Sequence, residues 1–297
     1  TRAVRGVSGY DGPMTDRRAL WSNGTVAHTS LKGQAAADRF TDGQVHRVTW
    51  PPFAALCSAP FGDRDRELLW GQAFNVLEKD KAWAFGYAIQ DGYAGYIEAR
   101  MLTPIVEPAT HRVSVRQTMA LAAPDFKNTK VEQVPLSLGS EVHVTVTDAK
   151  WATILGGPHD LYIPISHLTP LDTKEPDPVA VADRLLGTPY VWGGNSAFGI
   201  DCSGLVQIAC RACGIPCPGD SDQQMAQLGE TLDPGTSPER GDLLFWKGHV
   251  GWVANPDTLL HANAYSMSVA YEPLQSAIDR IAAQGDPVLR HARLTSH

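Results

Sequence analysis

The sequence has few cysteines, no long apolar run and no excess of basic residues. Five cysteines in 297 residues are an odd number, and a chain of this size does not need a disulfide framework, so we expect none. No run approaches the roughly 18–20 apolar residues of a membrane span, and residues 1–13 lack the apolar core of a signal peptide. The formal net charge of −7 argues against a nucleic-acid partner, which would need a basic face.

These absences favour a cytoplasmic protein, because free thiols suit a reducing compartment. An exported protein whose signal peptide has been removed is the alternative. The hydrophobic residues make up 43% of the chain, so two or three domains could each bury a core. The sequence carries no signal for an oligomeric state.

An internal repeat occupies the N-terminal half. The spacing from Gly71 to Trp83 recurs from Gly139 to Trp151, and the two blocks end alike in YIEARMLTP (96–104) and YIPISHLTP (162–170). Period-two alternation between Gly and Asp turns is typical of short strands. We therefore expect two small all-β SH3-like barrels, with one larger sandwich as the alternative. The expected boundaries are 46–105 and 106–172, with residues 1–45 as an extension packing on the first barrel.

The pattern changes after a linker rich in proline and acidic residues (170–178). A helix over 179–187 has Asp177 as its N-cap and Gly187 as its stop. A second helix over 202–213 ends at Gly214. Helices followed by antiparallel strands describe an α+β domain over 176–297. The expected strands and late helix are 242–246, 249–254, 258–264 and 273–285.

Cys202 stands at the first turn of the second helix and has three interpretations: a buried structural thiol, a metal ligand or a nucleophile. Unpaired N–H groups and the helix dipole favour a thiolate there, so we expect a lowered thiol pKa. Cys210 and Cys213 lie one turn apart on the apolar face, which favours core packing. With Cys217 they show no zinc-like spacing to a His or a further Cys pair, so we expect no metal and no cofactor.

Two histidines could serve a nucleophilic Cys202. A thiolate nucleophile needs a base and a residue that orients the base. His249 begins one predicted strand and His261 lies on the next, so a hairpin would turn both imidazoles to one face.

The segments LLGTPYVWGGNSAFGIDCSGLVQ, RGDLLFWKGHVGWV and LLHANA resemble the NlpC family of papain-like cell-wall peptidases. Those enzymes carry G-x-P-Y-x-W-G-G, D-C-S-G-L-V, G-D-L-x-F and H-V-G-I in this order. The likeness covers about 176–297, and the N-terminal half is similar to members with bacterial SH3-like domains that cleave free muropeptides. The resemblance implies a multidomain protein in which two SH3-like barrels precede an α+β papain-like cysteine peptidase domain.

The resemblance also implies the chemistry. Cys202 attacks, His249 is the base, His261 orients the base and Tyr190 lies beside the nucleophile. The substrate is a small peptidoglycan-derived peptide with a free N-terminal L-Ala, and hydrolysis of its γ-D-glutamyl–diamino-acid bond releases L-Ala-D-Glu. A lytic hydrolase of intact wall, a non-catalytic wall-binding protein, and an acyltransferase or amidase on another amide remain as alternatives.

A free amino end needs carboxylates and hydroxyls around it. Asp201 and Ser203 flank Cys202 and are our candidates, although Asp201 could instead cap the helix. By resemblance, Tyr93 in DGYAGY closes the amine pocket. Gln72 follows Gly71 where related sequences often carry a Glu that helps to bind the amine, so we also expect Gln72 at this site.

Overall fold

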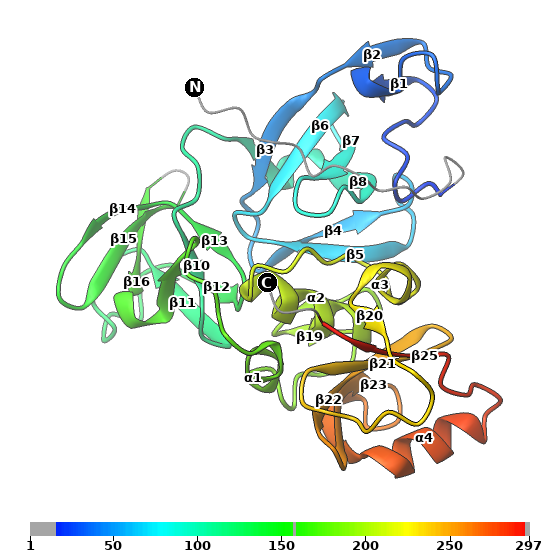
Figure 1. The fold of residues 1–297 in the computed structure, drawn as a ribbon. Helices are drawn as coiled ribbons and strands as arrows, with labels where there is room; N and C mark the ends of the chain where they lie inside the picture. The colour runs from blue at the N-terminus through cyan, green and yellow to red at the C-terminus, as the bar shows by residue number, and fades with distance from the viewer. Residues whose placement is uncertain (1–15, 157–158, 295–297) are drawn as a thin grey trace.

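The computed structural model of the protein describes residues 16–156 and 159–294 (Figure 1). They form three parts, which we name the first β unit (26–104), the second β unit (111–170) and the C-terminal domain (178–293). Figure 1 shows helix α2 (Cys202–Ala212) near the centre of the molecule, where the three parts meet. No helix among the described residues is long and apolar enough to cross a membrane.

The first β unit is built on a seven-stranded sheet in the order β5-β4-β8-β7-β6-β3-β9. Alternating apolar residues of these strands, among them Leu56, Phe74 and Ile97, form its core. A parallel pair, β1 and β2, precedes the sheet. The strands are β1 (Val26–His28), β2 (Arg39–Thr41), β3 (Gln44–Val48), β4 (Phe53–Cys57), β5 (Arg64–Leu69), β6 (Ala73–Lys79), β7 (Trp83–Ala88), β8 (Ala94–Glu98) and β9 (Leu102–Pro104).

The residues before β3 pack on this sheet, as far as the structure describes them. The Trp21 ring stacks on Tyr87 with 4.0 Å between ring centroids, and its indole N–H donates to the Gly92 carbonyl at 2.8 Å. Ala94 N–H donates to the Arg18 carbonyl at 2.7 Å, which joins the N-terminal segment to β8. The expected extension over 1–45 includes residues 1–15, which lie outside the described residues, and its expected end falls inside β3.

The second β unit has a separate core, around Leu136, Ile154 and Ile163. A five-stranded sheet (β12-β11-β16-β15-β14) faces a three-stranded one (β13-β10-β17). The strands are β10 (His111–Val113), β11 (Gln117–Leu121), β12 (Gln133–Ser137), β13 (Glu141–Val142), β14 (Val144–Thr147), β15 (Trp151–Leu155), β16 (Asp160–Pro164) and β17 (Leu168–Pro170).

The sequence repeat is a structural repeat. Gly71 and Gly139 have φ of +79° and +87°, the left-handed region that favours glycine. Gly71 N–H donates to the Val48 carbonyl of β3 at 2.8 Å, and Gly139 N–H donates to the Val113 carbonyl of β10 at 2.9 Å. Each LTP segment is a short strand that follows a 3₁₀ turn, η2 (Ala99–Met101) or η3 (Ile165–His167). The units touch at Gly71, where a Cβ would lie 1.7 Å from the Glu141 carbonyl oxygen.

The C-terminal domain packs helices against a six-stranded sheet in the order β20-β25-β21-β22-β23-β24. Its helices are α1 (Pro178–Asp183), α2, α3 (Ser221–Gln227) and α4 (Leu274–Ala282). A two-stranded sheet of β18 and β19 leads into α2. The strands of the whole domain are β18 (Asn195–Ser196), β19 (Gly199–Ile200), β20 (Glu230–Thr231), β21 (Asp242–Trp246), β22 (His249–Asn255), β23 (Thr258–Asn263), β24 (Ser268–Pro273) and β25 (Arg290–Arg293).

The predicted elements of this domain form with small shifts. Helix α2 begins at Cys202 and is followed by Gly214 at φ +73°. Helix α1 starts as expected, because Asp177 accepts hydrogen bonds from two N–H groups of the first turn. It ends at Asp183, before the predicted end at Gly187, whose N–H donates to Val269 of β24 at 2.8 Å. The short elements α3, β20, β24 and β25 were not anticipated.

All five cysteines are free thiols. Cys210 is fully buried in the domain core and Cys217 lies beside it, so core packing describes both. Cys213 is half-buried against the same core. Among the described residues, no three His, Cys, Asp or Glu side chains are grouped to hold a metal.

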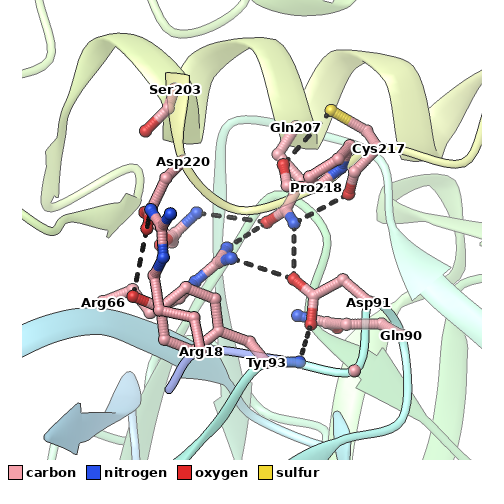
Figure 2. A network of polar contacts seen from close by, with 12 residues as sticks. Arg18, Arg66, Gln90, Asp91, Tyr93, Ser203, Gln207, Cys217, Pro218 and Asp220 are labelled. Atoms are coloured by element: carbon pink, nitrogen blue, oxygen red, sulfur yellow. Dashed lines mark hydrogen bonds and ion pairs between the residues drawn. The ribbon is translucent and has the colours of Figure 1, made fainter. Parts of the chain in front are cut away.

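A buried polar network joins the first β unit to α2 (Figure 2). Arg66 of β5 pairs with Asp91 at 2.9 Å, and both side chains are 2% exposed. Gln207 of α2 accepts a hydrogen bond from Arg66 and donates to Asp91 at 2.7 Å. Arg211, one turn further on, reaches Glu141 of the second β unit at 3.1 Å. The orientation of α2 is therefore set by both β units.

We expect Arg66→Ala to lower the free energy of unfolding by about 3–5 kcal/mol, because Asp91 would stay buried without its cation. Chemical denaturation measures this change. Arg39→Ala is the control, since Arg39 pairs with Glu78 at 3.4 Å on the surface. That variant should change stability by less than about 1 kcal/mol. Equal effects of the two substitutions would contradict a buried origin of the stabilisation.

Candidate active site

The start of helix α2 is organised by Asp201. Its Oδ1 accepts from Gly204 N–H at 2.7 Å and from the Ser203 hydroxyl at 2.9 Å, and its Oδ2 accepts from Gly193 N–H at 2.9 Å. Asp201 is therefore the N-cap of α2. Its hydrogen bonds also fix the glycine turn before the helix, and this places Cys202 as the first helical residue.

Cys202 lies in the wall of a pocket of about 450 Å³. The residue is 5% exposed, and its Sγ lies 4.0 Å from the Gly248 carbonyl oxygen. Tyr190 and Ser203 line the same pocket, as the sequence predicts for residues beside the nucleophile. The pocket draws on all parts of the chain except the second β unit. Its lining is Asp16, Arg17, Arg18, Asp65, Tyr93, Tyr190, Trp192, Asp201, Cys202, Ser203, Asp220, Ser221, Asp222 and Gly248.

The two histidines meet as predicted. Strands β22 and β23 form an antiparallel pair, and the His249 Nε2 atom lies 2.9 Å from the His261 Nδ1 atom. On its far side, His261 Nε2 lies 3.1 Å from Glu272 Oε2 on β24. Arg280 of α4 donates to both Glu272 oxygens, at 2.9 and 2.7 Å. Sequence reasoning missed Glu272 and Arg280, since the pairing of β24 with β23 and the position of α4 bring them behind the histidines.

The pKa values correct one expectation. Burial raises the pKa of the Cys202 thiol to about 12, and the nearby Asp201 adds to the effect. Burial lowers the pKa of His249 to about 3 and that of His261 to about 4. The expected lowering of the thiol pKa is wrong, because burial outweighs the helix start. Thiol and imidazoles are therefore neutral at pH 7, and the thiol needs a base at the moment of attack.

The acidic end of the pocket is built around Asp220, which sequence reasoning also missed. Asp220 holds the N-cap position of α3, yet its side chain makes no capping hydrogen bond. Its Oδ2 instead accepts from the Tyr93 hydroxyl at 3.1 Å and from Arg18 at 2.7 Å (Figure 2). Tyr93 thus reaches the pocket as predicted. The Gly-Asp-Ser-Asp run before a short helix is an N-cap pattern that could have drawn attention to this position.

Two arginines of the N-terminal segment complete this end. Arg18 binds Asp16 and Asp222 in addition to Asp220, each at 2.7 Å. Arg17 pairs with Asp65 at 2.8 Å. Residues 16–18 are therefore a wall of the pocket, a role that the sequence did not indicate.

Gln72 is placed elsewhere. Its Oε1 accepts from Leu69 N–H at 2.9 Å within the turn between β5 and β6, and it does not line the pocket. The prediction that Gln72 belongs to the amine site is wrong, because the positive φ of Gly71 turns this segment toward the second β unit.

Residues 187–280 match the NlpC/P60 family, and residues 56–102 match the bacterial dipeptidyl-peptidase SH3 domain. The gamma-D-glutamyl-L-lysine dipeptidyl-peptidase of Bacillus subtilis is 38% identical over 102 residues, 31% of this chain and 33% of that protein. Dipeptidyl-peptidase 6 of Lysinibacillus sphaericus is 25% identical over 225 residues, 66% of this chain and 79% of that protein.

The fold has a relative among crystal structures. An NlpC/P60 family protein from Bacillus cereus superposes with a TM-score of 0.71 at 19% identity, covering 85% of this chain and 100% of that one. The Bacillus subtilis relative is matched over only a third of its own length, so the likeness concerns a part of each protein. Residues 187–280 therefore form an NlpC/P60 family domain, which follows a bacterial SH3 domain.

Proposed function

We propose that the protein is a cysteine peptidase that hydrolyses the γ-D-glutamyl–diamino-acid bond of peptidoglycan stem peptides with a free N-terminal L-Ala, releasing L-Ala-D-Glu. The observations that carry this proposal are the His249–His261 pair and the pocket that Cys202 and Tyr93 of the first β unit both line, with Gly248, the residue before His249, in its wall. The Bacillus subtilis relative's name, a gamma-D-glutamyl-L-lysine dipeptidyl-peptidase, supports the bond and the substrate class.

The chemistry follows from the neutral resting state. His249 takes the thiol proton as Cys202 Sγ attacks the γ-carbonyl carbon of D-Glu. The first N–H groups of α2 have no helical partner and can stabilise the oxyanion. The protonated His249 then gives its proton to the leaving amine. Water, deprotonated by His249, hydrolyses the thioester and restores the thiol.

The pocket's charge favours an ammonium group. Five carboxylates line it against the two guanidinium groups of Arg17 and Arg18. We assign the ammonium to Asp220, with the hydroxyls of Tyr93 and Ser203 beside it. Asp201 was our candidate from the sequence, but three donors of α2 and its preceding turn already occupy its oxygens. Tyr93 and Arg18 line this end of the pocket, and in our proposal they limit what can extend beyond the first residue of a peptide.

We also propose the finer architecture and the location. The separate core of the second β unit and its repeated turns support a second SH3-like barrel, and the helix–sheet order of the C-terminal domain supports a papain-like α+β fold. The five free thiols suit a reducing cytoplasm. There, a specificity for free amino ends would serve the recycling of imported peptides.

Substitutions at the three catalytic positions should rank in severity. Cys202→Ala should abolish hydrolysis of L-Ala-γ-D-Glu-diaminopimelate with the fold intact, and His249→Ala should lower kcat by about 100- to 10,000-fold. His261→Ala should cost less, because the His261 ring orients His249 and does not itself take the thiol proton. Mass spectrometry of the products gives the rates, and circular dichroism checks the fold. Turnover by Cys202→Ala would contradict the assignment of Cys202 as the nucleophile. A greater loss of kcat in His261→Ala than in His249→Ala would mean that the two histidines have the opposite roles.

Blocking the substrate's amine should weaken cleavage. N-acetyl-L-Ala removes the cation and adds bulk against the wall, and loss of a hydrogen bond between charged groups costs about 1.5–3 kcal/mol. At about 1.4 kcal/mol per tenfold, kcat/KM should fall roughly 10- to 100-fold. Equal rates on the two peptides, or efficient release from intact cross-linked sacculi, would indicate a lytic hydrolase instead.

Asp220→Asn tests the assignment of the ammonium. Loss of a hydrogen bond to a charged group, about 1.5–3 kcal/mol, should raise KM for the free-amine peptide roughly 10- to 100-fold, with a smaller change in kcat. Asp257→Asn, at an exposed turn between β22 and β23, is the matched control. An unchanged KM in Asp220→Asn would move the amine site elsewhere in the pocket.

A further inference from the structure

His261 is contacted at both ring nitrogens. Its Nδ1 lies 2.9 Å from His249 Nε2 and its Nε2 lies 3.1 Å from Glu272 Oε2, and the side chain is fully buried. A neutral imidazole has one N–H donor and one acceptor nitrogen. The group at Nε2 therefore decides whether Nδ1 donates to His249 or accepts from it.

Glu272 settles this choice by its charge. Hydrogen bonds from Arg280 hold the pKa of the Glu272 carboxyl below its usual range, so it is ionised at pH 7 and can only accept. Arg280 is itself held in place, with its guanidinium carbon 4.4 Å from the centroid of the Tyr265 ring. His261 must then carry its proton on Nε2, toward the carboxylate, and present Nδ1 as an acceptor.

The tautomer of His261 determines the tautomer of His249. An acceptor at His261 Nδ1 requires a proton on His249 Nε2. Since neutral His249 has one proton to place, its Nδ1 is left as the acceptor. The proposed function makes this the nitrogen that takes the thiol proton of Cys202, whose Sγ lies 4.0 Å from the carbonyl oxygen of Gly248, the residue before His249. The opposite arrangement would put a proton on His249 Nδ1 and leave the thiol without a base.

We propose that Glu272, held by Arg280, is a positioning residue that sets the tautomers of both histidines and so makes His249 Nδ1 the base for Cys202. The assignment rests on the proposed function for the identity of the base. When the thiol proton moves to His249 Nδ1, the new imidazolium keeps its Nε2 proton on His261, and Glu272 stays ionised behind the pair. A histidine in the orienting position can either donate or accept, so it needs a fixed anion behind it.

The direct test is the location of the imidazole protons in the full-length protein. Nitrogen-15 NMR of histidine-labelled protein near pH 7 should find the proton on Nε2 of both His249 and His261, with signals assigned by His249→Gln and His261→Gln. Glu272→Ala should abolish the single Nε2 tautomer of His261. A proton on His261 Nδ1 in the unaltered protein would overturn the proposal.

Alkylation by iodoacetamide tests the consequence without any substrate. Glu272→Ala should slow modification of Cys202, followed by peptide mass spectrometry, about tenfold to a hundredfold at pH 7. This decrease is a part of the roughly 100- to 10,000-fold rate enhancement that a general base typically supplies. Glu272→Gln keeps the shape of the side chain and a carbonyl acceptor, but it places an NH₂ group against Arg280. The decrease in its alkylation rate should therefore be intermediate. It carries the test if the Ala variant fails to fold.

Tyr271→Phe is the control. Tyr271 precedes Glu272 on β24, its side chain points to the other face, and its hydroxyl donates to Asp183 at 2.7 Å. It should alkylate like the unaltered protein. On the peptide substrate, the Glu272 variants should lose kcat and keep KM. Unchanged alkylation and kcat in both Glu272 variants would refute the positioning role. Absence of peptide hydrolysis in a protein with the expected tautomers and alkylation rates would refute only the proposed function.

Discussion

The buried pairing of Arg66 with Asp91, completed by Gln207 of α2, is the contact on which the pocket depends. It joins a strand of the first β unit to the helix that begins at Cys202. Because both charges are removed from water, the pair tolerates little displacement. Tyr93 lies two residues from Asp91, with Arg66 stacked 5.1 Å from its ring centroid. The position of the pocket wall relative to the nucleophile is thus set by the same network.

Burial and the helix start have opposite effects on the pKa of the Cys202 thiol. The helix N-terminus favours an anion, whereas the walls that exclude water from Cys202 favour the neutral thiol. The second effect is the larger here, as the pKa of about 12 indicates. Exclusion of water from the pocket therefore raises the pKa of the thiol. The histidine pair, with Glu272 behind it, compensates by accepting the thiol proton.

Much of the site was predictable from local sequence. The Asp-Cys-Ser run opening an apolar helix, and two histidines on strands separated by a short turn, predicted Cys202, His249 and His261 because capping and strand alternation act over a few residues. Glu272 and Asp220 were not predictable in this way. Each reaches the site through strand pairing or a loop whose course depends on distant contacts. The failure at Gln72 has the same cause, since the contact of Gly71 with the second β unit decides where that turn points.

The pocket walls come from stretches of chain that are far apart, including residues 16–18, Asp65 and Tyr93 ahead of the C-terminal domain. A C-terminal domain excised from this chain would keep Cys202 and both histidines but would lose the pocket walls that residues 16–18, Asp65 and Tyr93 supply. In evolution, gain or loss of the leading β unit would therefore change the shape of the pocket and leave Cys202 and the histidines unchanged.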